Sequence, residues 1–157
     1  MRWLVLALGV VGLLAGCGDD HKSAQPLSKK AYEDQFNALV AKVDAGPKVV
    51  APPNATPQQQ GEALDNGLQK IRSLAAELDR LNPPADIRRA HDQFVEGLRE
   101  IADQGQLAVK ALKAGDDATG RRLVSSFAKP ATLRKITAAR KEFVRKGYHL
   151  GEVSPSP

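Results

Sequence analysis

Apolar residues at helical spacing are the feature that most constrains the fold of this chain. They recur at steps of three or four at Leu64, Leu68, Ile71, Leu74, Leu78 and Leu81. This spacing places them on one face of an α-helix, and that face must be buried against another element. Thr56-Pro57-Gln58-Gln59 supplies an N-cap, a first-position proline and a capping-box glutamine, and Pro83-Pro84 predicts an end near Asn82.

Three further segments show the same period. The first is expected over 28–44, with Ser28 as its N-cap and Gly46-Pro47 after its end. A third is expected from Pro83 or Pro84 to Gly115, with Asn82 as a cap. A fourth is expected to start at Asp116-Asp117, to break or kink at Pro130 and to resume over about 131–149. The pattern therefore predicts an all-α fold, an antiparallel bundle of about four helices in up-down-up-down order.

The first 16 residues have a different character. Met1-Arg2 is followed by an apolar run from Trp3 to Gly16, which is the pattern of a secretory signal. A membrane-spanning helix needs roughly 17–25 apolar residues, so this run is short for an uncleaved anchor, which is the alternative interpretation. Leu14-Ala15-Gly16-Cys17 resembles the lipobox of bacterial lipoproteins. That resemblance implies cleavage before Cys17, attachment of acyl chains such as palmitate to its thiol, and a lipid-anchored protein on the extracytoplasmic face of the cell membrane.

These patterns divide the chain into four parts. They are a signal peptide over 1–16, a flexible lipidated tether over 17–27, the bundle over 28–150 and a disordered tail over 151–157. Cys17 is the only cysteine, so no disulfide forms within the chain.

Positive charge is concentrated late in the chain. Residues 121–157 hold nine Lys or Arg and two Asp or Glu. Residues 17–120 hold 13 Lys or Arg and 16 Asp or Glu. An apolar arc is expected on the last helix from Leu133, Ile136, Phe143, Val144 and Leu150. The predicted opposite face consists of Arg134, Lys135, Lys141, Arg145 and Lys146. Arg140 falls within the apolar arc, where it must extend to solvent or find an acid.

Two interpretations of this basic face stay open. It binds an anionic partner, such as lipid headgroups, a wall polymer or an acidic protein, or it is an ordinary solvated helix surface. Nucleic acid is not expected as a partner, because the protein is predicted to be exported and has few aromatic residues for base stacking.

His91 is the only histidine on an apolar stripe. It is either a ligand or acid–base group at a helix-lined pocket, or a structural histidine packed against the second helix. No histidine has the spacing of a metal motif and no nucleophile has the setting of a hydrolase, so neither a metal, a cofactor nor an enzymatic activity is predicted.

A second resemblance is looser. Leu81-Asn82-Pro83-Pro84, followed by His91 and Phe94, resembles small helical lipoproteins of high-GC Gram-positive bacteria. It implies an all-helical envelope protein and brings no catalytic residues. The expected function is a membrane-anchored, non-enzymatic binding or scaffolding module. The alternatives are a carrier of an apolar ligand or haem near His91, and an envelope enzyme that no motif supports. The partner, the oligomeric state, the biological process and the choice between inner and outer membrane stay open.

Overall fold

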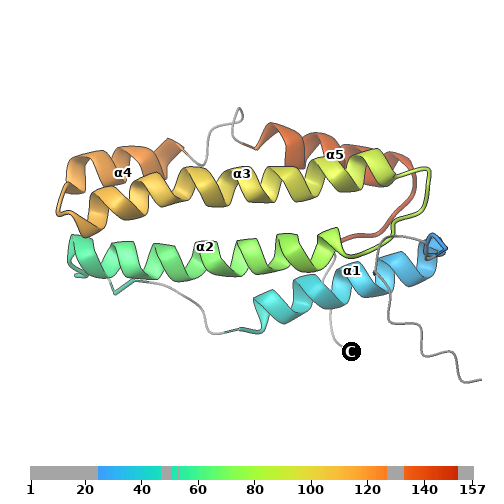
Figure 1. The fold of residues 1–157 in the computed structure, drawn as a ribbon, viewed down its shortest axis with the longest axis horizontal. Helices are drawn as coiled ribbons and strands as arrows, with labels where there is room; N and C mark the ends of the chain where they lie inside the picture. The colour runs from blue at the N-terminus through green and yellow to red at the C-terminus, as the bar shows by residue number, and fades with distance from the viewer. Residues whose placement is uncertain (1–24, 47–50, 53, 127–132, 152–157) are drawn as a thin grey trace, which may run out of the picture.

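Five α-helices account for most of the described part of the chain. The computed structural model describes residues 25–46, 51–52, 54–126 and 133–151, and no strand occurs within them. The helices are α1 (Lys29–Asp44), α2 (Pro57–Asp79), α3 (Arg88–Lys113), α4 (Asp117–Ser126) and α5 (Arg134–Arg145). Helices α1 and α3 run in one direction, and α2, α4 and α5 run in the other (Figure 1). The predicted all-α, antiparallel helical bundle is confirmed.

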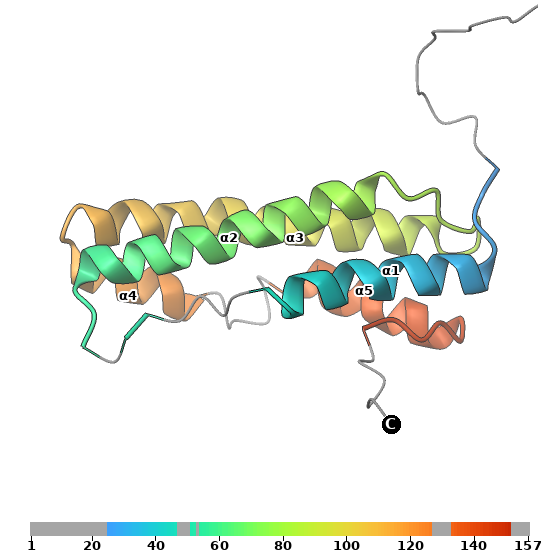
Figure 2. The ribbon, with the colours of Figure 1, turned by 90° about the horizontal axis from the view of Figure 1, so that it is seen from below.

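Helices α4 and α5 share the fourth position of the bundle. Both pack along α3, α4 against its C-terminal half and α5 against its N-terminal half (Figure 1). They flank residues 127–132, which contain Pro130 and lie outside the described residues. Because α1 is short and lies beside the C-terminal half of α2 (Figure 2), four helices meet at one end of the bundle and three at the other.

The predicted helix starts are confirmed for α1 and α2. The Ser28 hydroxyl accepts a hydrogen bond from the Ala31 amide at 3.3 Å. In α2 the Thr56 hydroxyl accepts from the Gln59 amide at 3.3 Å, and the Gln59 side chain accepts from the Thr56 amide at 2.9 Å. This reciprocal pair is a capping box, which satisfies two backbone donors at once.

The predicted start of α3 was wrong. The helix begins at Arg88, after a turn in which the Ile87 amide donates to the Pro84 carbonyl at 3.2 Å. A proline disfavours helical backbone at the residue before it, so Pro84 keeps Pro83 out of the helix. Asn82 is not the cap of α3. Its carbonyl accepts a hydrogen bond from the Leu27 amide at 2.9 Å instead.

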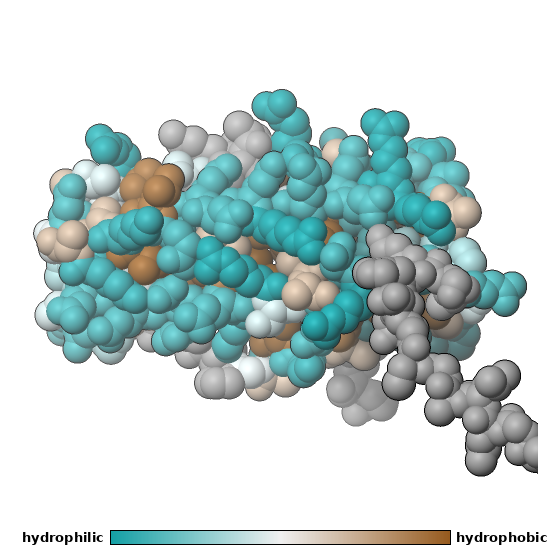
Figure 3. Space-filling view, viewed as in Figure 1, coloured by the Kyte–Doolittle hydropathy of each residue, from teal (hydrophilic) through white to brown (hydrophobic). Residues whose placement is uncertain are grey.

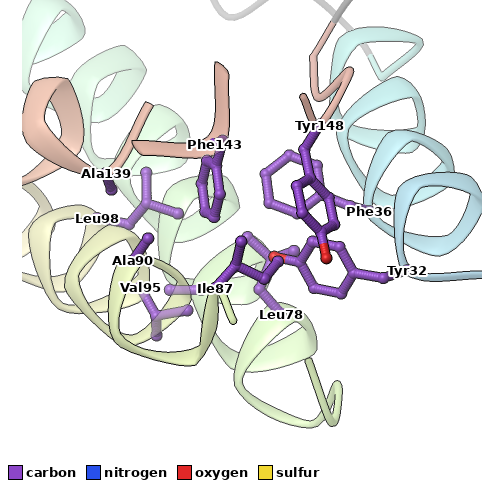
Figure 4. Packing of buried hydrophobic residues seen from close by; sticks show 11 residues of the cluster. Tyr32, Phe36, Leu78, Ile87, Ala90, Val95, Leu98, Ala139, Phe143 and Tyr148 are labelled. Carbon is purple, nitrogen blue, oxygen red and sulfur yellow. The ribbon is translucent and has the colours of Figure 1, made fainter. Parts of the chain in front are cut away.

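The main hydrophobic core lies where α1, α2, α3 and α5 meet (Figure 4). Aromatic rings from α1, α3, α5 and the segment after α5 fill its centre. The ring of Tyr32 is 6.0 Å from that of Tyr148 in an edge-on arrangement, and the ring of Phe36 is 6.2 Å from that of Phe143. Such edge contacts add to the stabilisation that burial provides. The aromatic core therefore joins the first helix to the last segment of the described chain.

The residues after α5 return along α1. The Asn37 side-chain amide donates to the His149 carbonyl at 3.0 Å, and its oxygen accepts from the Gly151 amide at 2.8 Å. Burial raises the pKa of Tyr148 to about 12, so its phenol stays protonated and donates to Asp86 at 3.0 Å. Residues 147–151 thus tie α1 to α5 and to the α2–α3 connection. Residues 152–157, most of the predicted tail, lie outside the described residues.

Candidate functional site

The predicted lipidation site, Cys17, lies outside the described residues, with the rest of residues 1–24. The structure does show where the chain that leads from it joins the bundle. The Leu27 amide donates to the Asn82 carbonyl at 2.9 Å, and the Leu27 side chain packs against the core. Leu27, which was expected in the tether, is therefore part of the packed domain. The chain joins the bundle beside the α2–α3 connection.

Helix α5 packs on the bundle through a narrow seam. Ala139 and Phe143 are buried, and Ile136 is partly buried against the same core. Val144 is 73 % exposed, so its predicted place on the apolar arc was wrong. It is rotated by about 100° from Phe143 and points away from the seam. Arg140 is likewise exposed and does not lie within an apolar arc.

The five predicted cations of α5 do not form one face. Arg134, Lys141 and Arg145 are spaced by seven and four residues, so they share the side of α5 that faces away from α3. Lys146 is the C-cap of the helix and is half-buried. Lys135 departs most clearly from the prediction, because it pairs with acids of α3.

Lys135 reaches toward α3, with 37 % of its side chain exposed. Its Nζ lies 2.5 Å from Glu100 Oε1 and 2.6 Å from Glu96 Oε1, and both acids belong to α3. These two hydrogen-bonded carboxylates, Glu100 above all, raise the pKa of Lys135. The placement of Lys135 on the outer basic face was wrong, because a residue next to the seam can reach the neighbouring helix. Its charge is neutralised within the fold.

The outward face of α5 is defined here by its exposed residues: Arg134, Thr137, Ala138, Arg140, Lys141, Val144 and Arg145. Arg145 forms a two-point contact with Glu142, at 2.7 Å through Nε and 2.5 Å through Nη2. This contact lowers the pKa of Glu142 and raises that of Arg145. Within the described ranges, Arg134, Arg140 and Lys141 take part in no ion pair. The face therefore presents, around the exposed Val144, three cations that pair with no acid of the described residues.

His91 lies at the centre of the aromatic core. It is 2 % exposed, and its Nδ1 is 2.9 Å from the hydroxyl of Tyr32, which is fully buried. The two rings meet edge-on with centroids 5.7 Å apart. Nε2 is buried and makes no hydrogen bond of normal geometry within the described part of the chain. The interaction connects α1 to α3 across 59 residues of sequence.

The surroundings of His91 favour its neutral form. Burial lowers its pKa below 6.5, and this effect outweighs the opposing influence of Asp92, Asp79 and the Leu78 carbonyl. Burial also raises the pKa of Tyr32. A neutral imidazole can accept a hydrogen bond from the Tyr32 hydroxyl at Nδ1 while it carries its own proton on Nε2. Coordination of haem iron would require open space beside Nε2, whereas Nε2 is buried, so the observed packing favours the structural interpretation of His91.

Two features of this region were not predicted from the sequence. Tyr32 was assigned only to an apolar stripe, although a buried tyrosine usually finds a partner for its hydroxyl. Asn37 was not singled out, because nothing in the local pattern connects it to residues 149 and 151. Both contacts depend on the tertiary arrangement, since each joins segments more than 50 residues apart.

Neither a metal-binding cluster nor a membrane-spanning helix occurs within the described residues. No group of three or more His, Cys, Asp or Glu is placed to hold a metal ion. None of the helices in this part of the chain has both the length and the hydropathy needed to cross a bilayer. The face shown in Figure 3 is largely hydrophilic, with small separate hydrophobic patches.

Comparison with known proteins identified no relative: no family model, no curated protein and no solved structure matches this chain. The outward face of α5 is therefore assigned as the candidate site from its geometry and charge alone.

Proposed function

We propose that this protein is an extracytoplasmic lipoprotein, anchored in the cell membrane through Cys17, that acts as a non-enzymatic binding or scaffolding module of the cell envelope. The observation that carries the proposal is Leu14-Ala15-Gly16-Cys17 at the end of a charged-then-apolar leader. The bundle supports it in one respect. The chain joins the packed domain at Leu27, so only ten residue steps separate the proposed lipid from the fold.

The binding function is proposed to use the outward face of α5. Arg134, Arg140 and Lys141 present positive charge that no acidic side chain of the described fold neutralises. Near an anionic bilayer, each such residue contributes about 1 kcal/mol of attraction. An anionic partner in the envelope is therefore the class that this face fits best.

The anchor is tested in cells that express the full chain and its Cys17→Ser variant. We expect the wild-type protein in the membrane fraction with a mass that reports an acylated chain starting at Cys17. Trp3 is the only tryptophan, so the mature protein should show no tryptophan fluorescence. An unmodified mass, or an equal distribution of both proteins between membrane and soluble fractions, would rule out the proposed anchor.

The binding role is tested by crosslinking the lipidated protein in native membranes. The test variant carries Arg134→Glu and Lys141→Glu, and the control carries Lys110→Glu and Arg122→Glu, which reverse two exposed cations on α3 and α4. We expect the crosslinked species to be lost in the test variant and retained in the control. Equal crosslinking by both variants would show that α5 is not the contact surface.

A further inference from the structure

The outward face of α5 combines two properties that a solvated helix surface does not need together. It carries Arg134, Arg140 and Lys141, which pair with no acid in the part of the chain that the structure describes, and it exposes 73 % of Val144 among them. Basic residues beside an exposed apolar side chain are typical of helices that lie in the plane of a membrane interface. The one acid on α5, Glu142, is already bound by Arg145.

The position of α5 relative to the proposed lipid makes this surface accessible to a membrane. The hydroxyl of Tyr148, three residues after α5, donates a hydrogen bond to Asp86 in the α2–α3 connection. The Leu27 amide donates a hydrogen bond to the Asn82 carbonyl in the same connection. The end of α5 and the start of the packed domain therefore lie at one end of the bundle (Figures 1 and 2).

The covalent distances agree with this arrangement. Ten residue steps from Cys17 to Leu27 span at most about 36 Å. Helix α5, with 12 residues, is only about 18 Å long. Two helices packed side by side span about 20 Å, so the tether is also long enough for the lipid to reach a bilayer that lies against the outward face of α5 while the domain stays folded.

We propose that the outward face of α5 docks on anionic lipid headgroups, so that the bundle lies along the membrane and does not stand on the end that receives the tether. This inference rests on the proposed lipid anchor. Two acyl chains already suffice for stable attachment. The role of the basic face is therefore to fix orientation, leaving the surface of α2 directed toward the envelope.

The alternative contact surface is the α2–α3 connection together with the first turn of α3, which carry Arg80, Arg88 and Arg89. Its exposed cations are accompanied by Asp86 and by the exposed Asp92. No exposed large hydrophobic side chain is found among the described residues of that connection. The charge and the apolar exposure coincide on α5, and α5 is therefore assigned as the contact surface.

The test uses the lipidated mature protein in vesicles of phosphatidylcholine, with or without phosphatidylglycerol. Because lipidation occupies the thiol of Cys17, one introduced cysteine is the only site for a fluorophore. Ala138→Cys reports on the outward face of α5, Ala85→Cys on the α2–α3 connection, and Ser73→Cys on an exposed position of α2. Quenching by a lipid with a headgroup nitroxide measures how close each label lies to the membrane.

We expect the label at residue 138 to be quenched strongly on the anionic vesicles and weakly on phosphatidylcholine alone, while the label at residue 73 is unaffected on both. The difference at residue 138 should disappear at about 1 M salt, where the screening length falls to about 3 Å. Reversal of Arg134 and Lys141 to Glu should abolish this difference in quenching, whereas reversal of Arg88 and Arg89 to Glu should leave most of it.

Two results would overturn the docking proposal and leave the anchor intact. One is quenching at residue 138 that does not depend on phosphatidylglycerol. The other is quenching at residue 85, lost on reversal of Arg88 and Arg89, with none at residue 138. Failure of the anchor itself is separately visible, because an unmodified Cys17 would add a second fluorophore to every labelled variant.

Discussion

The hydroxyl of Tyr32 and Nδ1 of His91 lie 2.9 Å apart in the most deeply buried part of the bundle, where α1 meets α3. A polar pair in an apolar core stabilises the fold only while both members are present, because loss of one leaves the other buried without a partner. This relationship fixes which side of α1 faces α3, and it makes the pair a sensitive probe of the core.

Removal of the Tyr32 hydroxyl should destabilise the protein. Tyr32→Phe keeps the ring but leaves Nδ1 of His91 unsatisfied, which costs about 1–3 kcal/mol. Combining Tyr32→Phe with His91→Leu removes both polar groups, and the double variant should lose less stability than the two single variants added together. Urea unfolding of the four proteins measures this coupling. Strict additivity would show that the two groups do not interact.

Stability should fall as the pH drops below about 6.5, because burial lowers the pKa of His91 in the folded state. The unfolded state then binds a proton that the folded state resists. The contribution of His91 to the free energy of unfolding is complete above the pKa that His91 has in the unfolded state. It is lost as the pH falls from there through the pKa of the folded state, at up to about 1.4 kcal/mol per pH unit. His91→Gln should flatten the dependence between pH 7 and 5. An unchanged slope in urea midpoints would show that His91 does not titrate with unfolding.

The helices were predictable from the sequence because each carries its own local signals. Thr56 and Gln59 act within one turn of each other, and their capping box forms as expected. The start of α3 was misplaced because two successive prolines satisfy the pattern of a first helical turn at several positions. Only tertiary contacts decide between these positions: the burial of Ile87 and the hydrogen bond from the Leu27 amide to the Asn82 carbonyl.

The candidate site was only partly predictable. A helical projection places Arg134, Lys141 and Arg145 on one side, since their relation is set by helix geometry, and all three are exposed. It misplaced Lys135 and Val144, because the width of the buried seam depends on how α3 approaches α5. Gly97 permits that approach, and nothing in the sequence of α5 reveals it.

Gly97→Ala and Gly67→Ala should have opposite effects on stability. A Cβ at residue 97 would lie 2.7 Å from Ile136 Cγ1 and 3.2 Å from the Ile136 backbone nitrogen, so α5 must move away from α3. Overpacking of this kind costs about 1–3 kcal/mol. A Cβ at residue 67, within α2, meets nothing within 4 Å and should stabilise the helix by about 0.5–1 kcal/mol. Thermal unfolding of both variants shows whether each substitution raises or lowers stability. A stabilising effect of Gly97→Ala would contradict the close packing of α3 and α5.

Asn37→Ala should loosen both α1 and the segment that follows α5. The substitution removes the donor to the His149 carbonyl and the acceptor for the Gly151 amide, each worth about 0.5–1.5 kcal/mol. Asn37→Asp keeps an acceptor for Gly151 but loses the donor, so its effect should be intermediate. Amide hydrogen exchange should increase in α1 and at residues 149–151, with little change in the half of α3 that packs against α4. Uniform acceleration across the whole bundle would show instead that Asn37 acts on global stability and not on this local contact.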